Sequence, residues 1–315
     1  MANALVTGGA GFIGSTLVDM LVEQGYQVTV LDDLSHGKKE HLEQSINDIT
    51  LIEGSVVDLP TVKKAVDGAD YVFHLAANRS IRGSFETPIQ SNRVNVEGTM
   101  NVLAASLDAG VKRVVFSASS AMYGSNPETM PLREDMPAHP ESPYAIQKLM
   151  GEYFMRYYWQ VQGLETVSLR YFNAYGPRDD ISLSEGAVIQ IFISRILQGK
   201  SITIHGTGEQ NRDFTFVRDI AAANIAAATH AKKEVLGEPV NVAANSSITI
   251  NELFKEICAI TGKTVPVTHS EPRFGDVFAS SGDPSRAKEF MDFECEWKFK
   301  DGLKKTIDWV HETIQ

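Results

Sequence analysis

The sequence predicts an α/β fold, in which a doubly wound parallel sheet is followed by a smaller C-terminal α/β region. Three observations predict it. A glycine-rich turn stands between a short apolar strand and a helix near the N-terminus, apolar strands alternate with helices over the first half of the chain, and loops rich in Gly, Asp and Ser begin after Gly176-Pro177. Such alternation is typical of a parallel sheet covered by helices on both faces.

The glycine-rich turn has the spacing of a dinucleotide-binding site. It follows the apolar residues 4–7 and precedes residues 12–24, where apolar side chains recur at helical spacing. Gly8 permits a tight turn, Gly11 lets the backbone approach a pyrophosphate, and Gly14 lets the helix pack closely on the strand. The phosphates would then meet free amides at the start of the helix.

A carboxylate ends the second strand. The strand covers residues 27–31, and Asp32 follows eighteen residues after Gly14. A carboxylate at this position accepts hydrogen bonds from the adenosine ribose hydroxyls and repels a 2′-phosphate. The sequence therefore favours NAD over NADP. Lys38 and Lys39 could soften that preference, but we interpret them as solvated loop charges.

The pattern of alternating elements continues beyond Asp32. Strands are predicted at residues 50–53, 71–75, 113–117 and 166–170, and helices at 60–66, about 94–108 and about 143–161. We assign residues 1–175 to a nucleotide-binding domain and residues 176–315 mainly to a substrate domain, with a helix at 188–197 and a strand at 202–204. Residues 215–245 return to the first domain in this prediction, because a helix at 219–228 and a strand at 240–242 could rejoin its sheet.

Composition excludes several classes of protein. The 315 residues carry a net charge of −11, which argues against a nucleic-acid backbone as partner. Cys258 and Cys295 are far apart, so neither a disulfide framework nor a metal site is expected, and a reducing cytoplasm suits them. Polar residues interrupt the most apolar later stretch, residues 187–197, so we expect no membrane segment and no secretory signal.

Tyr144 and Lys148 carry the predicted chemistry. They lie four residues apart on a predicted helix, so both side chains project from one face. An ammonium beside a phenol, with a positive nicotinamide ring nearby, favours the phenolate, which can take a proton from an alcohol while hydride leaves the same carbon. Ser119 and Ser120 follow a strand ending at Ser117 and should face the same crevice, where one of them can bind the reacting hydroxyl.

An ordered set of segments resembles the extended short-chain dehydrogenase/reductases, that is, the NAD-dependent epimerase/dehydratase family, and within it the UDP-glucose 4-epimerase group. The resemblance covers nearly the whole chain and implies a Rossmann fold. The segments that carry it are residues 7–14, 74–77, 95–99, 117–124, 144–148 and 170–173.

The resemblance implies a role for individual residues. Ser119 matches the catalytic hydroxyl, Tyr144 the base and Lys148 its partner, and no residue matches a metal ligand. The residues implied in NAD binding are Gly8, Gly11, Phe12, Ile13, Gly14, Asp32, Ser55, Val56, Leu75, Ala76, Ala77, Asn95, Ser117, Tyr144, Lys148 and Tyr171. Those implied in substrate binding are Ser119, Ser120, Tyr144, Asn173, Val188, Arg212, Arg273, Asp276 and Ser280.

Two of these residues, Arg212 and Arg273, match the arginines that hold the diphosphate of the sugar nucleotide. Two guanidinium groups from separate loops suit a pyrophosphate, although ordinary salt bridges are the alternative. His74, at the end of an apolar strand, is expected to be a structural histidine. Arg79 and Arg82 lie in a loop where a phosphate or sugar contact and a solvated position are equally open.

The chain departs from the family pattern at four places. Gly54 is followed by Ser55 rather than Asp, which weakens or changes the adenine contact, and Gln147 replaces a more usual Ser. Phe278 stands where many relatives carry Arg, which leaves one substrate contact open. Ser120-Ala121 stands where the sugar-nucleotide dehydratases of the family carry Asp-Glu, so dehydration is disfavoured.

The function implied by the resemblance is NAD-dependent 4-epimerisation of a UDP-hexose by transient oxidation at carbon 4. The small Ser280 predicts room for the N-acetyl sugars beside UDP-glucose and UDP-galactose. The alternatives are another nucleotide-sugar oxidoreductase, such as a 4-keto sugar reductase, and a non-catalytic NAD sensor. The resemblance also implies a homodimer that pairs through the helices at about 94–108 and 143–161, and the cysteine usage favours the cytoplasm.

Overall fold

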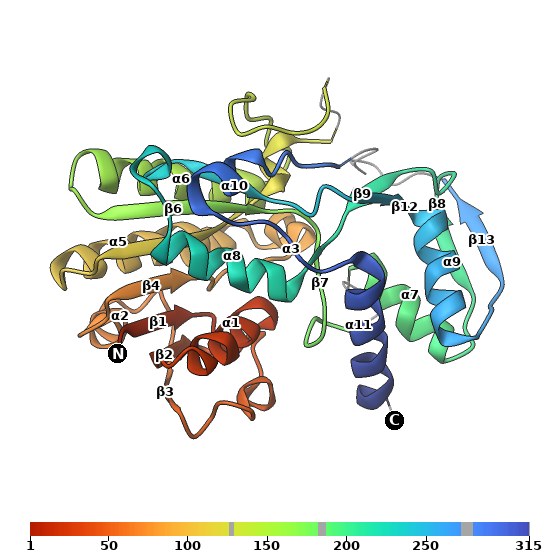
Figure 1. The fold of residues 1–315 in the computed structure, drawn as a ribbon, viewed down its shortest axis with the longest axis horizontal. Coiled ribbons are helices and arrows are strands. Elements are labelled where there is room, and N and C mark those ends of the chain that lie inside the picture. Colours follow the sequence, from red (N-terminus) through yellow and green to blue (C-terminus); the bar gives the residue numbers. More distant parts are fainter. Residues whose placement is uncertain (126–128, 182–186, 272–279, 315) are drawn as a thin grey trace.

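Seven parallel strands form the central sheet of the described chain (Figure 1). The computed structural model describes residues 1–125, 129–181, 187–271 and 280–314. Within these ranges the strand order is β11-β6-β5-β4-β1-β2-β3, which confirms the predicted doubly wound parallel sheet. The strands are β1 (Asn3–Thr7), β2 (Gln27–Asp32), β3 (Ile49–Glu53), β4 (Tyr71–His74), β5 (Arg113–Ser119), β6 (Glu165–Tyr171) and β11 (Pro239–Val242).

Helices cover both faces of this sheet because successive strand side chains point to opposite sides. In β1, Ala4 and Val6 pack in the hydrophobic cluster that includes α1 (Phe12–Glu23) and α8 (Val217–Thr229). Leu5 packs in the cluster on the other face, with α2 (Leu59–Val66), α5 (Gly98–Asp108) and α6 (Pro143–Gln160). Each face therefore has its own core.

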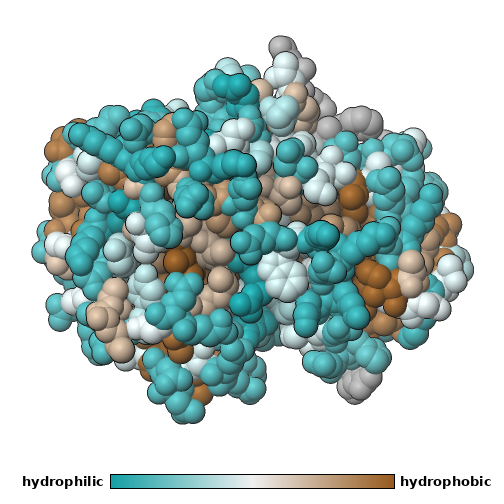
Figure 2. Space-filling model, viewed as in Figure 1, coloured by the Kyte–Doolittle hydropathy of each residue, from teal (hydrophilic) through white to brown (hydrophobic). Residues whose placement is uncertain are grey.

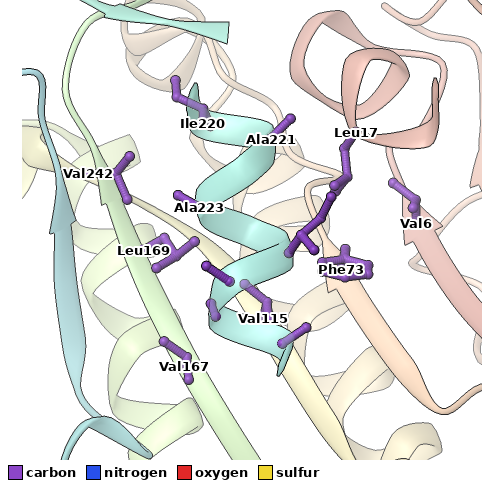
Figure 3. Packing of buried hydrophobic residues seen from close by; sticks show 14 of the residues in the cluster. Val6, Leu17, Phe73, Val115, Val167, Leu169, Ile220, Ala221, Ala223 and Val242 are labelled. Atoms are coloured by element: carbon purple, nitrogen blue, oxygen red, sulfur yellow. The ribbon is translucent and has the colours of Figure 1, made fainter. Parts of the chain in front are cut away.

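Small side chains bring α8 close to the sheet. Figure 3 shows Ile220, Ala221 and Ala223 of α8 between Leu169 of β6 on one side and Leu17 of α1 on the other. All five side chains are fully buried, and burial of this kind contributes roughly 25 cal/mol per Å² of apolar area. The chain thus returns from its C-terminal half to the first core, as the sequence predicts for the helix at 219–228 and the strand at 240–242.

The remaining elements form a C-terminal lobe with a core of its own. Its helices α7 (Val188–Leu197), α9 (Ile250–Thr261) and α11 (Phe299–Thr313) pack against each other and against short strands. Thr249 caps the start of α9 and forms a capping box with Glu252, and Gly262 caps its end at φ +65°. The strands are β7 (Ala174–Tyr175), β8 (Ile202–His205), β9 (Asn211–Asp213), β10 (Thr215–Phe216), β12 (Ser247–Thr249) and β13 (Val267–Ser270). The domain boundary near residue 175 stays a prediction.

Several elements differ from the sequence prediction. The helix expected at about 94–108 begins as a π-helical turn, η2 (Arg93–Glu97), before α5. The prediction did not include α9, α11 or the short strands β7, β9, β10, β12 and β13. It also did not include α3 (Ile81–Glu86), α4 (Pro88–Asn92), α10 (Ser285–Met291), η1 (Lys39–Leu42), η3 (Ser120–Tyr123) and η4 (Lys233–Val235). α6 starts where expected, because the Ser142 hydroxyl accepts the Ala145 N–H at 3.1 Å and Pro143 occupies the first turn.

Hydrophilic residues predominate on the face of the molecule shown in Figure 2, and hydrophobic ones occur there in small groups. Among the described helices, none has the length and apolar content that crossing a membrane requires.

Candidate active site

A cavity of about 1900 Å³ lies along the carboxyl ends of the central strands. Gly8 follows β1, Asp32 ends β2, Leu75 follows β4, Ser117 and Ser119 lie at the end of β5, and all of them line the cavity. The strand order reverses between β1 and β4, and crevices at such reversals are where open α/β sheets bind ligands. The far wall of the cavity comes from the C-terminal half of the chain.

The glycine turn is fixed by close packing. Gly8 has φ +71°, and a Cβ there would lie 2.7 Å from the Ala76 nitrogen. A Cβ at Gly14 would lie 2.1 Å from the Gly8 carbonyl oxygen, so the helix start could not approach the turn. At Gly11 a Cβ would have one close neighbour, the Gly8 oxygen at 3.1 Å. Gly8 and Gly14 are therefore needed by the protein itself, while Gly11 leaves a bare stretch of backbone on the cavity wall.

Backbone amides orient the carboxylate of Asp32. One oxygen accepts the Ala10 N–H and the other accepts the Leu34 N–H, both at 2.9 Å. Burial raises the pKa of this carboxyl group, and the two amides act in the opposite direction. Each oxygen retains a second lone pair, and Asp32 lines the cavity, so the group can accept both hydroxyls of a ribose.

Ser119, Tyr144 and Lys148 meet on one wall of the cavity. The Lys148 ammonium donates to the Ser117 carbonyl at 2.6 Å and lies 5.9 Å from the centre of the Tyr144 ring. The Ser119 hydroxyl accepts the Ala121 N–H at 3.2 Å and lies near enough to the Tyr144 side chain to lower the pKa of its phenol. The three side chains predicted from the sequence are thus brought together by β5 and α6.

Burial dominates the electrostatics of the pair. Burial raises the pKa of Tyr144, while an interaction with Ser119 and the charge of Arg79 lower it. Burial also lowers the pKa of Lys148, to about 7. The Lys148 nitrogen points to the Ser117 carbonyl, and the effect of its charge on the phenol stays a prediction.

His74 is structural, as expected. It is buried between two hydroxyl groups, with Nδ1 2.8 Å from Thr7 Oγ1 and Nε2 2.9 Å from Thr99 Oγ1. Burial, with a smaller contribution from the charge of Lys148, lowers its pKa to about 3. A neutral imidazole therefore ties β1 and β4 to α5 beneath the cavity.

Asn173 and Ser280 meet on the wall of the same cavity. The Asn173 amide donates to the Asp213 carbonyl at 2.9 Å and to the Ser280 hydroxyl at 3.3 Å. Both residues line the cavity together with Ser120 and Arg212. The positions of Arg273, Asp276 and Phe278 lie outside the described residues.

Three expected binding residues do not line the cavity. Asn95 is buried, and its amide holds Asn78 and Gln147 instead, at 2.8 Å each. Gln147 therefore accepts a hydrogen bond that holds the Asn95 side chain in place. The Ser55 hydroxyl accepts the Val57 N–H at 3.4 Å, and Val188 packs into the core of the C-terminal lobe. The other described residues expected to bind NAD or substrate all lie on the wall.

Comparison with known proteins agrees with this geometry. The model of the NAD dependent epimerase/dehydratase family matches residues 4–243. The chain belongs to this family. It is 37% identical to a UDP-glucose 4-epimerase of Thermotoga maritima solved with UDP-glucose (TM-score 0.93; 99% of this chain, 100% of that one). It is 39% identical to a UDP-N-acetylglucosamine 4-epimerase of Methanobrevibacter ruminantium (TM-score 0.93; 99% of each chain). It is also 32% identical to a UDP-glucuronate 4-epimerase of Thermodesulfobacterium geofontis (100% of this chain, 98% of that one).

Family membership identifies the protein as an NAD-dependent enzyme with a Rossmann fold. The described residues fit this cofactor. A Cβ at Gly11 would stand on the cavity wall at the start of the helix, and Asp32 lines the same cavity. The same carboxylate disfavours a 2′-phosphate.

The structure also reveals site residues that the sequence analysis left open or missed. Arg79 pairs with Asp179 at 2.8 Å, and both residues line the cavity with Asp180. Arg178, at φ +69°, pairs with the buried Asp19 at 2.7 Å. The resemblance ended at residue 173 in this region, and no periodicity marks the acidic pair that follows Gly176-Pro177, so the sequence carried no signal for these contacts.

Proposed function

We propose that this enzyme interconverts UDP-hexoses that differ in configuration at carbon 4. One observation carries the proposal: Ser119, Tyr144 and Lys148 lie on the wall of the cavity that also contains the glycine turn and Asp32. Its volume, about 1900 Å³, is larger than the ~300–1000 Å³ of a typical small-molecule pocket, which leaves room for two nucleotides.

Each polar group on the wall has a role in this proposal. Tyr144 takes the proton of the 4-hydroxyl and returns it, and Ser119 holds the hydroxyl oxygen by a hydrogen bond. NAD, when bound, supplies a group that accepts hydride and gives it back. Lys148, tied to Ser117, fixes the position of α6 relative to β5. The remaining residues expected in NAD and substrate binding keep those roles in the proposal, Arg273 and Asp276 included.

The similar proteins are named for different UDP-sugars, so we infer the substrate of this enzyme from the residues of its pocket. We infer that UDP-glucose and UDP-galactose are substrates and that N-acetyl forms are accepted too, because the side chain at position 280 is a serine on the cavity wall. Its hydroxyl accepts a hydrogen bond from the Asn173 amide at 3.3 Å, and the side chain is small enough to leave room for an acetamido group.

We also infer a homodimer, from a stripe of exposed apolar residues on α6. Ile146, Met150, Tyr153 and Tyr157 recur at intervals of four, three and four residues, so they lie on one face of the helix, and they are 37–58% exposed. Met100 of the neighbouring α5 is exposed as well. Contiguous exposed apolar surface of this kind marks an interaction site.

The proposed reaction is tested by following purified enzyme with UDP-galactose in anomeric proton NMR spectra. UDP-glucose should appear without added nicotinamide, because an epimerase consumes none. A reductase would need stoichiometric NADH or NADPH, and a sensor would show no turnover. Either outcome contradicts the proposal.

A further inference from the structure

A buried aspartate adjoins three residues of the cavity wall, Asn173, Arg212 and Ser280. Asp213 is the last residue of β9 and directly follows Arg212, and its exposed fraction is 0%. Its backbone N–H donates to the Ser280 carbonyl at 2.8 Å, and its own carbonyl accepts the Asn173 amide at 2.9 Å. The main chain of Asp213 is therefore hydrogen-bonded to two of the three wall residues and covalently joined to the third.

The carboxylate of Asp213 joins two further segments. Its Oδ1 accepts the Ala244 N–H at 3.1 Å, and its Oδ2 accepts the Gly282 N–H at 3.2 Å. Ala244 comes two residues after β11, an edge strand of the central sheet, and Gly282 comes two residues after Ser280. One side chain thus ties the segment that carries Ser280 to the end of the central sheet.

A second residue of β9 holds the same segment. The side-chain oxygen of Asn211 accepts the Ser280 N–H at 3.2 Å. The peptide groups on both sides of Ser280 are thus bonded to β9, because its carbonyl accepts the Asp213 N–H. The Ser280 hydroxyl in turn accepts the Asn173 amide at 3.3 Å. Contacts with β9 and Asn173 therefore set the position of Ser280 on the cavity wall.

The negative charge of Asp213 strengthens these contacts. Burial raises the pKa of its carboxyl group, and the backbone amides of Gly282 and of residues 244–246 act in the opposite direction. Hydrogen bonds to an ionised acceptor are roughly twice as strong as those between neutral groups. An asparagine has nearly the same shape but only one accepting oxygen, and its NH2 group would face a backbone N–H. It therefore cannot keep both contacts.

We propose that Asp213, together with Asn211, is a positioning residue that holds Asn173, Arg212 and Ser280 in the geometry that binds the sugar nucleotide. The proposal rests on the proposed function, in which these three wall residues contact the UDP-sugar. Asp213 and Asn211 are both described residues that lie outside the cavity wall. Their contacts join β9 to the segments around it and not to the acid–base residues or the glycine turn. Loss of these contacts should therefore weaken sugar-nucleotide binding and spare the chemical step.

The test is Asp213→Asn in the NAD-loaded enzyme. KM for UDP-galactose should rise about tenfold or more while kcat stays within about threefold of wild type, the split expected when ground-state binding is lost. The calorimetric Kd for UDP, which carries the diphosphate that Arg212 is proposed to bind, should rise by a similar factor. The dinucleotide content of the denatured supernatant should stay the same. An unchanged KM, or a fall in kcat without a rise in KM, would overturn the proposal.

Asp219→Asn is the matched control. Asp219 is also a buried aspartate, and its two oxygens accept the N–H groups of Glu296 and Trp297 at 3.0 and 3.2 Å. None of these three described residues lines the cavity. The control variant should lower the melting temperature as Asp213→Asn does, but it should leave KM and the Kd for UDP unchanged. An equal rise of Kd in both variants would indicate general damage to the C-terminal lobe and would overturn the proposal.

Asn211→Ala provides the test if Asp213→Asn does not fold. It removes the acceptor of the Ser280 N–H and leaves the buried carboxylate in place. KM for UDP-galactose should rise about threefold or more with kcat unchanged, which is the effect of losing one ordinary hydrogen bond. A wild-type KM in this variant would in that case overturn the proposal.

The binding measurement keeps this proposal separate from the proposed function. A wild type that binds UDP but turns over no UDP-hexose contradicts the epimerase proposal, and the Kd values for UDP then still decide the positioning role. Normal epimerisation with unchanged KM and Kd in Asp213→Asn overturns the positioning role alone. A wild type that does not bind UDP overturns both proposals.

Discussion

The Lys148 nitrogen lies 2.6 Å from the carbonyl oxygen of Ser117, and this contact joins α6 to the end of β5. It holds Tyr144, one helical turn earlier, beside Ser119 at the end of the same strand. The buried lysine, through its contact with the backbone, therefore positions Tyr144 relative to Ser119. Removal of the Tyr144 hydroxyl should then affect chemistry without disturbing the packing.

Tyr144→Phe should lower kcat by roughly a hundredfold or more, the usual size of a lost acid–base group. The fold and the bound NAD should persist, because the contact between Lys148 and Ser117 does not involve the phenol oxygen. Turnover by NMR and the dinucleotide content of the denatured supernatant measure the two effects. Tyr153→Phe is the control, since this exposed tyrosine lies on the same helix away from the cavity. Retention of most activity in Tyr144→Phe would refute the mechanism.

The glycines should separate cofactor binding from folding. Gly11→Ala places a methyl group on the cavity wall with one tight protein contact, so we expect a normal melting temperature and NAD binding weaker by on the order of tenfold or more. Gly14→Ala forces a Cβ against the Gly8 oxygen and should destabilise the protein itself, by on the order of 1–3 kcal/mol. Thermal unfolding and calorimetric titration with NAD test both. Equal loss of stability in the two variants would contradict this distinction.

Local patterns in the sequence were sufficient to predict the sheet, the glycine turn and the pair Tyr144 and Lys148, whereas Ser119 was chosen over Ser120 by the family resemblance. Strand and helix periods act over a few residues, and the rule that ligands bind at the carboxyl ends of strands brings Ser119 to the cavity. The pairing of Arg79 with Asp179 could not be predicted in this way. The two residues are 100 positions apart, and their contact depends on the tertiary arrangement of two loops.

Polar residues beneath the cavity show the same limit. Asn95 belongs to a recognisable segment, yet its amide is used up by Asn78 and Gln147. Whether a buried amide turns to a ligand or to a neighbouring loop depends on the packing of α4, η2 and α6, which no local pattern encodes. The same applies to Lys148, whose partner is a carbonyl group 31 residues away.

His74 should make stability depend on pH. Its pKa is about 3 in the folded protein and about 6.5 when unfolded, so between these values only the unfolded state takes up a proton. The contribution of His74 to the free energy of unfolding is therefore fully present above about pH 6.5 and is lost as the pH falls toward 3. Between pH 7 and pH 5 the loss is about 2 kcal/mol. Urea unfolding at several pH values measures this. His74→Gln should be less stable at pH 7 but should lack this part of the acid sensitivity. An unchanged pH slope would show that another group is responsible.

The dimer should depend on the apolar stripe of α6. Tyr153→Glu places a charge at its centre, where burial against a second copy would be costly, so the variant should run as a monomer of 34.6 kDa. Light scattering at micromolar concentration should give twice this mass for wild type. Lys64→Glu, on α2 of the same face of the sheet, makes a charge change outside the stripe and should leave the mass unchanged. A monomeric wild type would reject the dimer.

Ser280 should decide whether N-acetyl sugars enter the pocket. Its side chain is 7% exposed on the cavity wall, and Asn173 holds its hydroxyl at 3.3 Å. Wild type should interconvert UDP-N-acetylglucosamine and UDP-N-acetylgalactosamine as well as the glucose pair. Ser280→Tyr should lose the N-acetyl activity first, because a phenol at this position occupies the space of the acetamido group while hexoses still fit, a form of specificity by clash. Parallel NMR assays with both pairs measure the change, and Ser280→Ala serves as control because it keeps the space and removes only the hydroxyl. Wild-type turnover of UDP-galactose with none of UDP-N-acetylgalactosamine would show that another part of the pocket sets the sugar range.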